Sequence, residues 1–380
     1  MPPRSSGAAT IRDVARLSGV SIATVTRTFQ GSPRVRPETR ERVREAATKL
    51  GYHPDTVART LVTGRSNTVG MLVPSLVQAY WGELADAIEH RAGELGYSVM
   101  IASSRGDPDR ERAMLDVLFG KRLDGVILAG VLSDPDGWPG RNGHRPPLVL
   151  VEWDATPKWD VFEALCSAPL TQPAWRLVEE HLPGDWIAHV SYDDVAGATI
   201  ATQHLLDLGH TEVAFLAGPP VRTCLLRLLG VRSTLERAGH RMHAPEVTAD
   251  AFEDARTAAT KLLRRPSRPS GLVCYSDVIA VGAMRAAHEL GLRVPEDLSI
   301  TGFDDIALAG YIDPPLTTIR NPKRELGELA LELLLEPPER HGDRYRRLSG
   351  ELVVRGSTAA PSVPAELAST TPSRVADRRA

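Results

Sequence analysis

The sequence predicts a small all-α head joined to a larger α/β body of two lobes with parallel sheets. Near the N-terminus, two short amphipathic helical stretches are separated by a glycine turn. Residues 1–66 hold 12 basic and 5 acidic side chains, a net charge of +7, so the rest of the chain must carry −10 to give the total of −3. From residue 68 onward, apolar runs of strand length alternate with helical stretches, which is typical of sheets covered by helices on both faces.

The first predicted helix covers residues 11–17 and the second begins at Ser21. Thr10, with Asp13 three residues later, and Ser21 are start signals for these helices. Gly19 permits a sharp turn between them. Apolar residues at helical spacing bury one side of each helix: Ile11, Val14, Ala15, Val20, Val25 and Phe29. The residues left for the outer face are Ile22, Ala23, Thr24, Thr26 and Arg27. This is a helix-turn-helix arrangement, whose second helix lies in the major groove of DNA.

A third helix begins at Pro37 and ends at Gly51, and it completes a three-helix core. Its apolar stripe consists of Val43, Ala46, Ala47 and Leu50. Another kind of small three-helix domain is the alternative. The positive charge confined to this segment favours DNA binding, because attraction to phosphate is then localised in one module.

Three stretches of this segment, Ile11–Ala15, Ser18–Ser21 and Thr24–Arg27, together resemble the LacI (lactose-repressor-like) family of bacterial transcription regulators. Thr26 stands where serine is usual, and Thr28-Phe29-Gln30 replaces the usual aliphatic pair and asparagine. The resemblance implies DNA contacts from this head: Thr10, Ser21, Ile22, Ala23, Thr24, Thr26, Arg27 and Arg34.

Residues 55–66 resemble the hinge of that family, with Asp55 as a cap and Gly64 as a terminator. A helix of about two turns is shorter than the roughly 12–15 residues needed for stability in water, so its folding should depend on DNA and on a partner hinge. The resemblance implies that Leu61 inserts between base pairs in the minor groove, and that Val57 and Ala58 contact DNA beside it. An ordinary linker, with Leu61 packed on a neighbour, is the alternative.

Composition excludes several classes of protein. The chain is 42% apolar but has no apolar run near the roughly 20 residues of a membrane span, and its first residues lack the apolar core of a signal peptide. Cys166, Cys224 and Cys274 are odd in number and widely spaced, which favours free thiols in a reducing compartment. We therefore expect a cytoplasmic protein with no membrane partner, no metal and no cofactor.

The alternation of strands and helices forms two halves, and no dinucleotide fingerprint follows the first strand. The body is therefore predicted to be two α/β lobes that bind a ligand. Strands are expected at 69–74, 98–102, 125–128, 213–216, 271–275 and 298–302, and helices at 84–95 and 110–119. The resemblance extends over residues 10–358, most clearly at 193–197, 302–305 and 355–358, and implies a periplasmic-binding-protein-like body. The expected domains are a disordered 1–9, a head at 10–54, a hinge at 55–66, a body at 67–358 and a disordered tail at 359–380.

The resemblance also implies which residues hold an effector. Tyr80 and Trp81 occupy positions at which aromatic rings stack on a sugar, and Arg227 and Asp304 match residues that bind its hydroxyl groups. Further candidates are Asp193, Ser276, Asp277 and Asn321. Ser276 departs from the family, where asparagine is common. The structural alternatives are packing between the lobes for Trp81 and an ion pair for Arg227 and Asp304.

An insert at about 152–190 contains Trp153, Trp159, Trp175 and Trp186. The sequence leaves open whether this insert is a lid over the cleft or a surface elaboration whose tryptophans pack locally.

Taken together, these patterns predict a transcriptional repressor that binds palindromic operator DNA as a homodimer or tetramer and responds to a sugar or similar small polar metabolite. An activator, or a repressor that needs a corepressor, is the alternative. An α/β enzyme is a distant alternative, with His210 or Asp304 as acid or base. The chain lacks a nucleophile elbow, metal-spaced ligands and a phosphate-binding glycine loop, so no catalytic residue is assigned.

Overall fold

The computed structural model describes residues 9–29, 31–53, 64–131, 133, 146–153, 159–167, 188–337 and 344–362. The chain separates into two compact units, Met1–Ser66 and Asn67–Ala380. The hinge residues Val57, Ala58 and Leu61 lie outside the described residues, as do Trp175 and Trp186 of the insert. Within the described ranges, no helix combines the length and the apolar composition needed to cross a bilayer.

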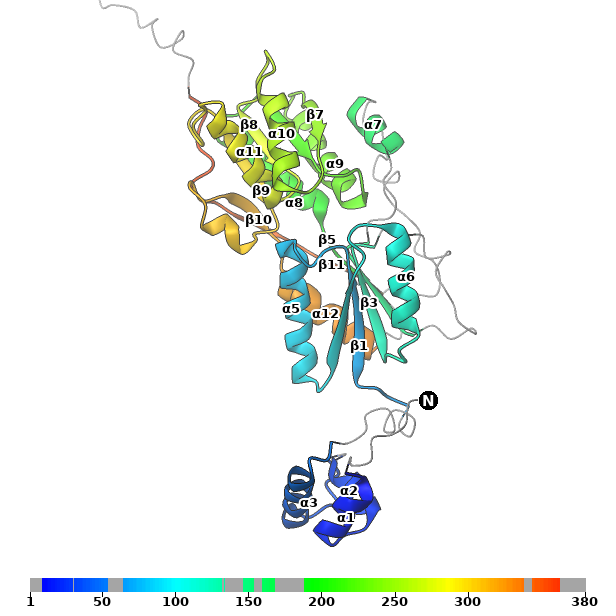
Figure 1. The fold of residues 1–380 in the computed structure, drawn as a ribbon. Coiled ribbons are helices and arrows are strands. Elements are labelled where there is room, and N and C mark those ends of the chain that lie inside the picture. Colours follow the sequence, from blue (N-terminus) through cyan, green and yellow to red (C-terminus); the bar gives the residue numbers. More distant parts are fainter. Residues whose placement is uncertain are drawn as a thin grey trace, which may run out of the picture. The chain divides into compact units, whose positions relative to one another are not determined.

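The head consists of α1 (Ile11–Ser18), α2 (Ile22–Phe29) and α3 (Pro37–Leu50) (Figure 1). The carboxylate of Asp13 accepts hydrogen bonds from the Thr10 amide at 3.0 Å and the Thr10 hydroxyl at 2.6 Å. The Thr24 amide donates to Ser21 Oγ at 3.1 Å, so Ser21 caps α2. Gly19 has a φ of 65°, as the turn requires. The three helices enclose the core expected from the sequence: Val14, Ala15, Val25, Val43, Ala46 and Ala47.

The body contains two six-stranded sheets, one in each lobe, which confirms the predicted α/β fold. Lobe 1 has the order β11-β5-β4-β3-β1-β2, and lobe 2 has the order β12-β10-β9-β8-β6-β7. The lobe 1 strands are β1 (Thr68–Val73), β2 (Ser98–Ser103), β3 (Gly125–Ala129), β4 (Leu148–Val151), β5 (Ala188–Tyr192) and β11 (Tyr345–Leu348). The lobe 2 strands are β6 (Val213–Ala217), β7 (His243–Val247), β8 (Gly271–Cys274), β9 (Ser299–Phe303), β10 (Thr317–Arg320) and β12 (Glu351–Val353). Described neighbours pair in parallel, except β10 and β12.

Helices cover both faces of each sheet (Figure 1). In lobe 1, α5 (Ala79–Glu94) and α12 (Lys323–Leu335) cover one face and α6 (Pro108–Phe119) covers the other. In lobe 2, α8 (Asp194–Asp207) and α9 (Arg222–Arg237) lie opposite α10 (Phe252–Leu263) and α11 (Asp277–Glu289). The short helix η4 (Ala307–Gly310) follows β9.

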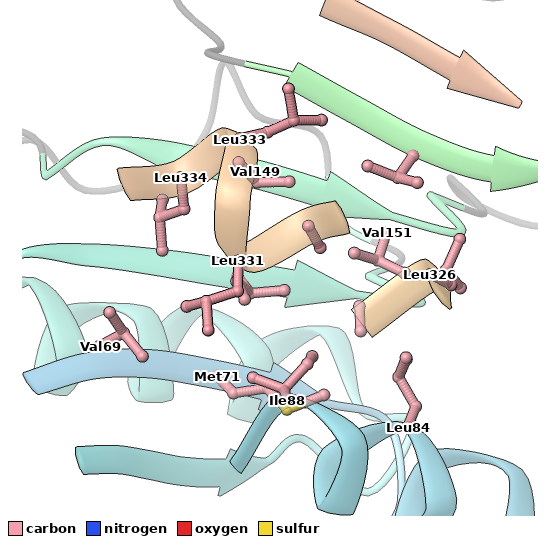
Figure 2. Close-up of a cluster of buried hydrophobic side chains, with 14 of the residues drawn as sticks. Val69, Met71, Leu84, Ile88, Val149, Val151, Leu326, Leu331, Leu333 and Leu334 are labelled. Carbon is pink, nitrogen blue, oxygen red and sulfur yellow. The ribbon is translucent and has the colours of Figure 1, made fainter. Parts of the chain in front are cut away.

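Helix α12 follows a lobe 2 strand in the chain but packs in the core of lobe 1. Figure 2 shows Leu326, Leu331 and Leu334 of this helix in one buried cluster with Ile88 of α5 and Val149 of β4. The two lobes are therefore not independent segments of the chain, because residues beyond position 320 complete the hydrophobic core that begins at β1.

The chain passes between the lobes three times, at residues 192–194, 320–323 and 348–351. The Asp193 amide donates to the Leu348 carbonyl at 2.9 Å, which joins the first crossing to the third. A Cβ atom on Gly350 would lie 3.1 Å from the Arg320 carbonyl, so the second crossing runs against the third. These three crossings form the connection about which the lobes can move.

Several sequence expectations need correction. Helix α5 begins at Ala79, not at residue 84, so Tyr80 and Trp81 lie in its first turn instead of a preceding loop. The predicted tail begins too early, because the Ala359 carbonyl accepts hydrogen bonds from His210 at 2.9 Å and Ser299 at 3.0 Å. Strands β4, β5, β7, β10, β11 and β12 were not expected.

The described part of the insert packs against the body. Trp153 is 6% exposed and lies in a lobe 1 core cluster. Helix α7 (Trp159–Ser167) places Phe162 and Leu165 in the lobe 2 core beside α9, while Trp159 is 54% exposed. Strand β5 begins at Ala188, inside the range assigned to the insert. These residues therefore support local packing for the part of the insert that the structure describes.

The position of α12 gives a stability prediction. Leu331 is fully buried, so Leu331→Ala should lower the free energy of unfolding by about 2–5 kcal/mol. Leu95, which is 42% exposed at the end of α5, is the matched control, and Leu95→Ala should cost less than about 1 kcal/mol. Urea unfolding of the full-length protein measures both. Equal costs for the two variants would contradict the assignment of α12 to the core of lobe 1.

Candidate functional site

A cleft of about 350 Å³ lies between the two lobes, at the carboxyl ends of their parallel strands. From lobe 1, Pro74 follows β1, Gly130 follows β3 and Glu152 follows β4. From lobe 2, the corresponding lining residues are Pro219 after β6, Asp250 after β7, Tyr275 after β8 and Asp304 after β9. The remaining lining residues belong mainly to the first turns of α5, α9 and α11: Gln78, Ala79, Tyr80, Trp81, Val221, Thr223, Arg227 and Val278, with Gly106 and Ile306.

Aromatic rings on the cleft wall are seated against glycines. The rings of Tyr80 and Trp81 meet edge to face, with centroids 4.7 Å apart. A Cβ atom on Gly130 would lie 2.5 Å from the Trp81 ring, and Gly130 also has a φ of 57°. The ring of Tyr275 lies on Gly218, where a Cβ atom would be 2.4 Å away. Any larger residue at either glycine would displace a ring that faces the cleft.

Arg227 is a buried arginine at the base of the lobe 2 wall. Its Nε donates to Asp194 Oδ1 at 2.8 Å, its Nη1 donates to the Tyr275 carbonyl, and its Nη2 lies 3.7 Å from Asp304 Oδ1. The guanidinium carbon lies 3.6 Å from the centre of the Phe303 ring and 4.7 Å from that of Tyr275. Burial acts to lower the pKa of Arg227, but the nearby carboxylates of Asp194 and Asp304 raise it by more than burial lowers it. The side chain therefore remains charged.

Asp304 stands in a strained backbone position, with a φ of 107°. Asn321 donates its side-chain amide to Asp304 Oδ1 at 3.1 Å. Burial raises the pKa of Asp304 to about 7, although Arg227 and Lys323 act to lower it. The carboxyl group therefore exists in both protonation states near neutral pH, and it can accept or donate a hydrogen bond in the cleft.

Two contacts join the lobes across the cleft. The side-chain amide of Gln78 donates to the Asp250 backbone carbonyl at 3.1 Å and to its carboxylate at 3.2 Å. Glu83 of α5 accepts a hydrogen bond from the Ala307 amide at 3.3 Å and pairs with Lys323 at 3.0 Å. Ser276 holds the other Asp250 oxygen, and burial raises the pKa of Asp250. Asp250 is thus both a cleft residue and a link between the lobes.

The structure brings together four of the eight residues expected at an effector site, since Tyr80, Trp81, Arg227 and Asp304 all line the cleft. The other four have different positions. Ser276 caps α11 through the Ile279 amide at 3.2 Å and orients Asp250. Asp277 is fully buried, where it accepts hydrogen bonds from the Ile306 amide and the Thr318 hydroxyl.

Asp193 and Asn321 lie in the crossings between the lobes. Asp193 caps α8 through the Ala196 amide at 3.0 Å. Asn321 orients Asp304 from behind the cleft wall. Sequence reasoning missed Gln78, Glu152, Asp250 and Tyr275 as lining residues. Their position in the sequence could have indicated three of them, because Glu152, Asp250 and Tyr275 follow the ends of strands by only a few residues.

The outer face of the head presents the residues expected to contact DNA. Thr10, Ser21, Ile22, Ala23, Arg27 and Arg34 are exposed, and Thr24 and Thr26 are half-buried. The Thr26 hydroxyl donates to the Ile22 carbonyl at 3.0 Å, which leaves Arg27 as the long donor on α2. Leu17, which is 51% exposed at the end of α1, is a further apolar residue on the head surface that sequence reasoning did not single out.

Metal chemistry finds no support in the parts of the chain that the structure describes, where no three His, Cys, Asp or Glu side chains are grouped to bind an ion. Cys166, Cys224 and Cys274 are free thiols.

Comparison with known proteins gives consistent matches to both units. Residues 10–55 match the profile described as bacterial regulatory proteins, lacI family. Residues 66–139 match periplasmic binding proteins and sugar binding domain of LacI family, and residues 202–358 match a periplasmic binding protein-like domain.

Individual proteins match over nearly the whole chain. The transcriptional repressor CytR of Escherichia coli K12 is 34% identical over 93% of this chain and 97% of its own. The ribose operon repressor of the same organism is 34% identical over 86% of this chain and 92% of its own. A solved structure of the Lac repressor dimer bound to operator and an anti-inducer aligns with a TM-score of 0.73 and 27% identity, covering 93% of this chain and 99% of that chain.

The raised pKa of Asp304 predicts how stability depends on pH. The folded protein keeps this proton up to about pH 7, whereas the ordinary pKa is 3.8, so folding takes up a proton between these values. The stabilisation that results is therefore lost as the pH rises from about 4 to about 7. Asp304→Asn should remove about 2–4 kcal/mol of this decline. The free energy of unfolding, measured between pH 4.5 and 8, tests this, with Asp254→Asn at an exposed position as the control. If the free energy of unfolding fell with pH equally in wild type and in Asp304→Asn, the raised pKa would not belong to Asp304.

Proposed function

This chain belongs to the LacI family of bacterial regulatory proteins, and from that premise we propose that it is a transcriptional repressor whose operator affinity is set by a sugar or similar small polar metabolite. The observation that carries the proposal is one chain that combines a basic helix-turn-helix head with an aromatic, carboxylate-lined cleft. The head supplies attraction to DNA, and the cleft supplies a switch.

The DNA-binding role rests on the outer face of α2. Arg27 is exposed there, and an arginine that forks to guanine O6 and N7 is the commonest specific contact in the major groove. Ile22 and Ala23 are exposed beside it and suit contact with thymine methyl groups. One head offers few base contacts, so two heads related by a two-fold axis read a palindrome, and the protein acts as a homodimer or as a tetramer formed from two such dimers.

The hinge role is carried over from the resemblance. In this proposal, residues 55–66 fold on the operator, and Leu61 enters the minor groove with Val57 and Ala58 beside it. A repressor must reach operator DNA to act, which supports a cytoplasmic location in this proposal.

The effector role rests on the cleft. Trp81 and Tyr275 offer apolar ring faces, while Asp250, Asp304 and Arg227 offer hydrogen-bonding groups, and sugars need both kinds of contact. Gln78 and Glu83 each bond across the cleft, so a ligand that inserts there changes the contacts between the lobes. Such coupling between two sites is reciprocal and typically about 1–3 kcal/mol.

The direction of the response has two forms within this proposal. A ligand that favours the lobe arrangement with low DNA affinity is an inducer, and one that favours the other arrangement is a corepressor. Operator binding measured across a ligand titration distinguishes them. An activator that binds the same operator remains the alternative. The enzyme alternative is set aside, since the family consists of DNA-binding regulators.

The first functional prediction concerns base reading. Arg27→Ala should weaken binding to an operator selected from random DNA by about 1–3 kcal/mol, through one base position in each half-site. Arg27→Lys is the matched control, because it keeps the charge but loses the bidentate fork. Arg27→Lys should preserve binding to random DNA and lose most of the preference for the operator over random DNA. If Arg27→Ala lost equal affinity for operator and random DNA, Arg27 would be a phosphate contact only.

The second functional prediction concerns the effector response. Trp81→Ala should leave operator binding without ligand within about threefold of wild type, and should raise the ligand concentration at half-response by tenfold or more, equivalent to about 1.4 kcal/mol. Trp159→Ala, at the 54% exposed tryptophan of α7, is the control and should behave as wild type. Fluorescence anisotropy of labelled operator measures both across titrations with a panel of sugars and nucleosides. A wild-type midpoint for Trp81→Ala would remove Trp81 from the effector site.

A further inference from the structure

We propose that this cleft selects an effector without phosphate or carboxylate groups, and that phosphorylation of the same compound abolishes its recognition. The effector class is a ring compound that is uncharged or carries an amino group. This inference rests on the proposed function, because it names the ligand chemistry of the same cleft.

The cleft wall has more acidic than basic side chains. Among the described lining residues, Glu152, Asp250 and Asp304 are acidic and Arg227 alone is basic. The two Asp250 oxygens accept hydrogen bonds from Ser276 and Gln78, which are both neutral. The positive charge on the wall is therefore outnumbered before any ligand arrives.

Arg227 is already engaged by the protein itself. Asp194 holds its Nε at 2.8 Å, the Tyr275 carbonyl holds Nη1, and Asp304 faces Nη2 at 3.7 Å. The rings of Phe303 and Tyr275 cover the guanidinium at 3.6 and 4.7 Å from their centres. A phosphate could reach this arginine only by displacing a carboxylate that pairs with it, and both would then compete for one charge.

Helix dipoles do not reverse this balance. The N-termini of α5, α9 and α11 reach the cleft at Ala79, Val221 and Val278. Each N-terminus acts as roughly half a positive charge, so the three together supply about +1.5. The acidic side chains of Glu152, Asp250 and Asp304 face this partial charge from the same wall, and the charge of Arg227 is matched by that of Asp194. Burial raises the pKa of Asp250 and of Asp304, while Arg227 acts to lower both.

The same wall suits a ligand rich in hydrogen-bond donors. Carboxylates accept hydrogen bonds from hydroxyl and amino groups, and aromatic rings such as Trp81 accept either an apolar ring face or a cation. The cleft volume of about 350 Å³ is near the lower end of the range for small-molecule sites, which fits a single sugar or a nucleoside.

This selection places the regulator within a reaction sequence. A kinase that phosphorylates the effector would remove it from the cleft. Uptake, or a hydrolase that releases the free sugar or nucleoside, would supply it. The protein therefore responds to the compound before phosphorylation.

The test uses the full-length protein on its selected operator and pairs of compounds that differ only in phosphate: ribose and ribose 5-phosphate, glucose and glucose 6-phosphate, cytidine and cytidine monophosphate, adenosine and adenosine monophosphate. Glucosamine is the cationic member of the panel. Isothermal titration gives Kd, and operator anisotropy gives the response. For each pair whose neutral member binds, we expect the phosphorylated member to bind at least about 100-fold more weakly, equivalent to about 2.8 kcal/mol.

Charge variants assign the effect to the cleft. Asp250→Asn removes one lining carboxylate and should reduce the ratio of phosphorylated to neutral Kd by about tenfold. Asp254→Asn, at an exposed position in the first turn of α10, is the matched control and should leave the ratio unchanged. Equal ratios for the two variants would overturn the role given to Asp250.

Two outcomes separate this inference from the function on which it rests. A phosphorylated compound that binds as tightly as its neutral partner, and also shifts operator binding, overturns the charge selection while the effector-controlled regulator stands. A panel in which no compound binds the protein or alters operator affinity overturns both.

Discussion

The buried guanidinium of Arg227 holds together the part of lobe 2 that forms the cleft. It bonds to Asp194 in the first turn of α8, to the Tyr275 carbonyl at the end of β8, and faces Asp304 at the end of β9. Removing one member of a buried ion pair leaves an uncompensated charge and costs several kcal/mol, so these groups depend on one another. The two sequence interpretations of Arg227, a structural ion pair and a cleft residue, therefore describe one arrangement. Arg227 lines the cleft and also holds its wall in place.

The same network reaches the crossings between the lobes. Asp194 follows Asp193, whose amide bonds to Leu348 in the third crossing, and Asn321 of the second crossing holds the carboxylate of Asp304. A ligand group that binds Asp304 thus acts on a residue held directly by a crossing segment. Packed interfaces tend to switch between discrete arrangements and do not deform continuously, so a small change at Asp304 can be converted into a change in how the lobes meet. The four residues that resembled effector contacts but lie behind the wall acquire a role here, because they position the wall and connect it to the crossings.

The candidate site was only partly accessible from sequence. Tyr80, Trp81, Arg227 and Asp304 lie in segments that resemble a known family, and they line the cleft. Asp250 and Gln78 were missed, since they are 172 residues apart and meet only because two different lobes place them across one cleft. The raised pKa of Asp304 could not be predicted from the sequence either, because it depends on burial and on neighbours that come from separate strands and crossings. Resemblance to a family identifies residues that match a pattern, but it does not show whether each side chain faces the cleft or lies behind the cleft wall.

The sequence by itself determined the head, the approximate positions of half of the strands of the body (β1, β2, β3, β6, β8 and β9) and the acidic character of the chain beyond residue 66. Caps such as Asp13 and Ser21, the turn at Gly19 and the apolar spacing of α1 to α3 act between residues three or four positions apart, so they can be identified without knowing the rest of the fold. Only the tertiary structure decided that α12 completes lobe 1, that Trp81 rests on Gly130 and that three carboxylates share a cleft with one arginine. Those outcomes depend on contacts between distant segments, whose free energy appears only when the whole core is buried.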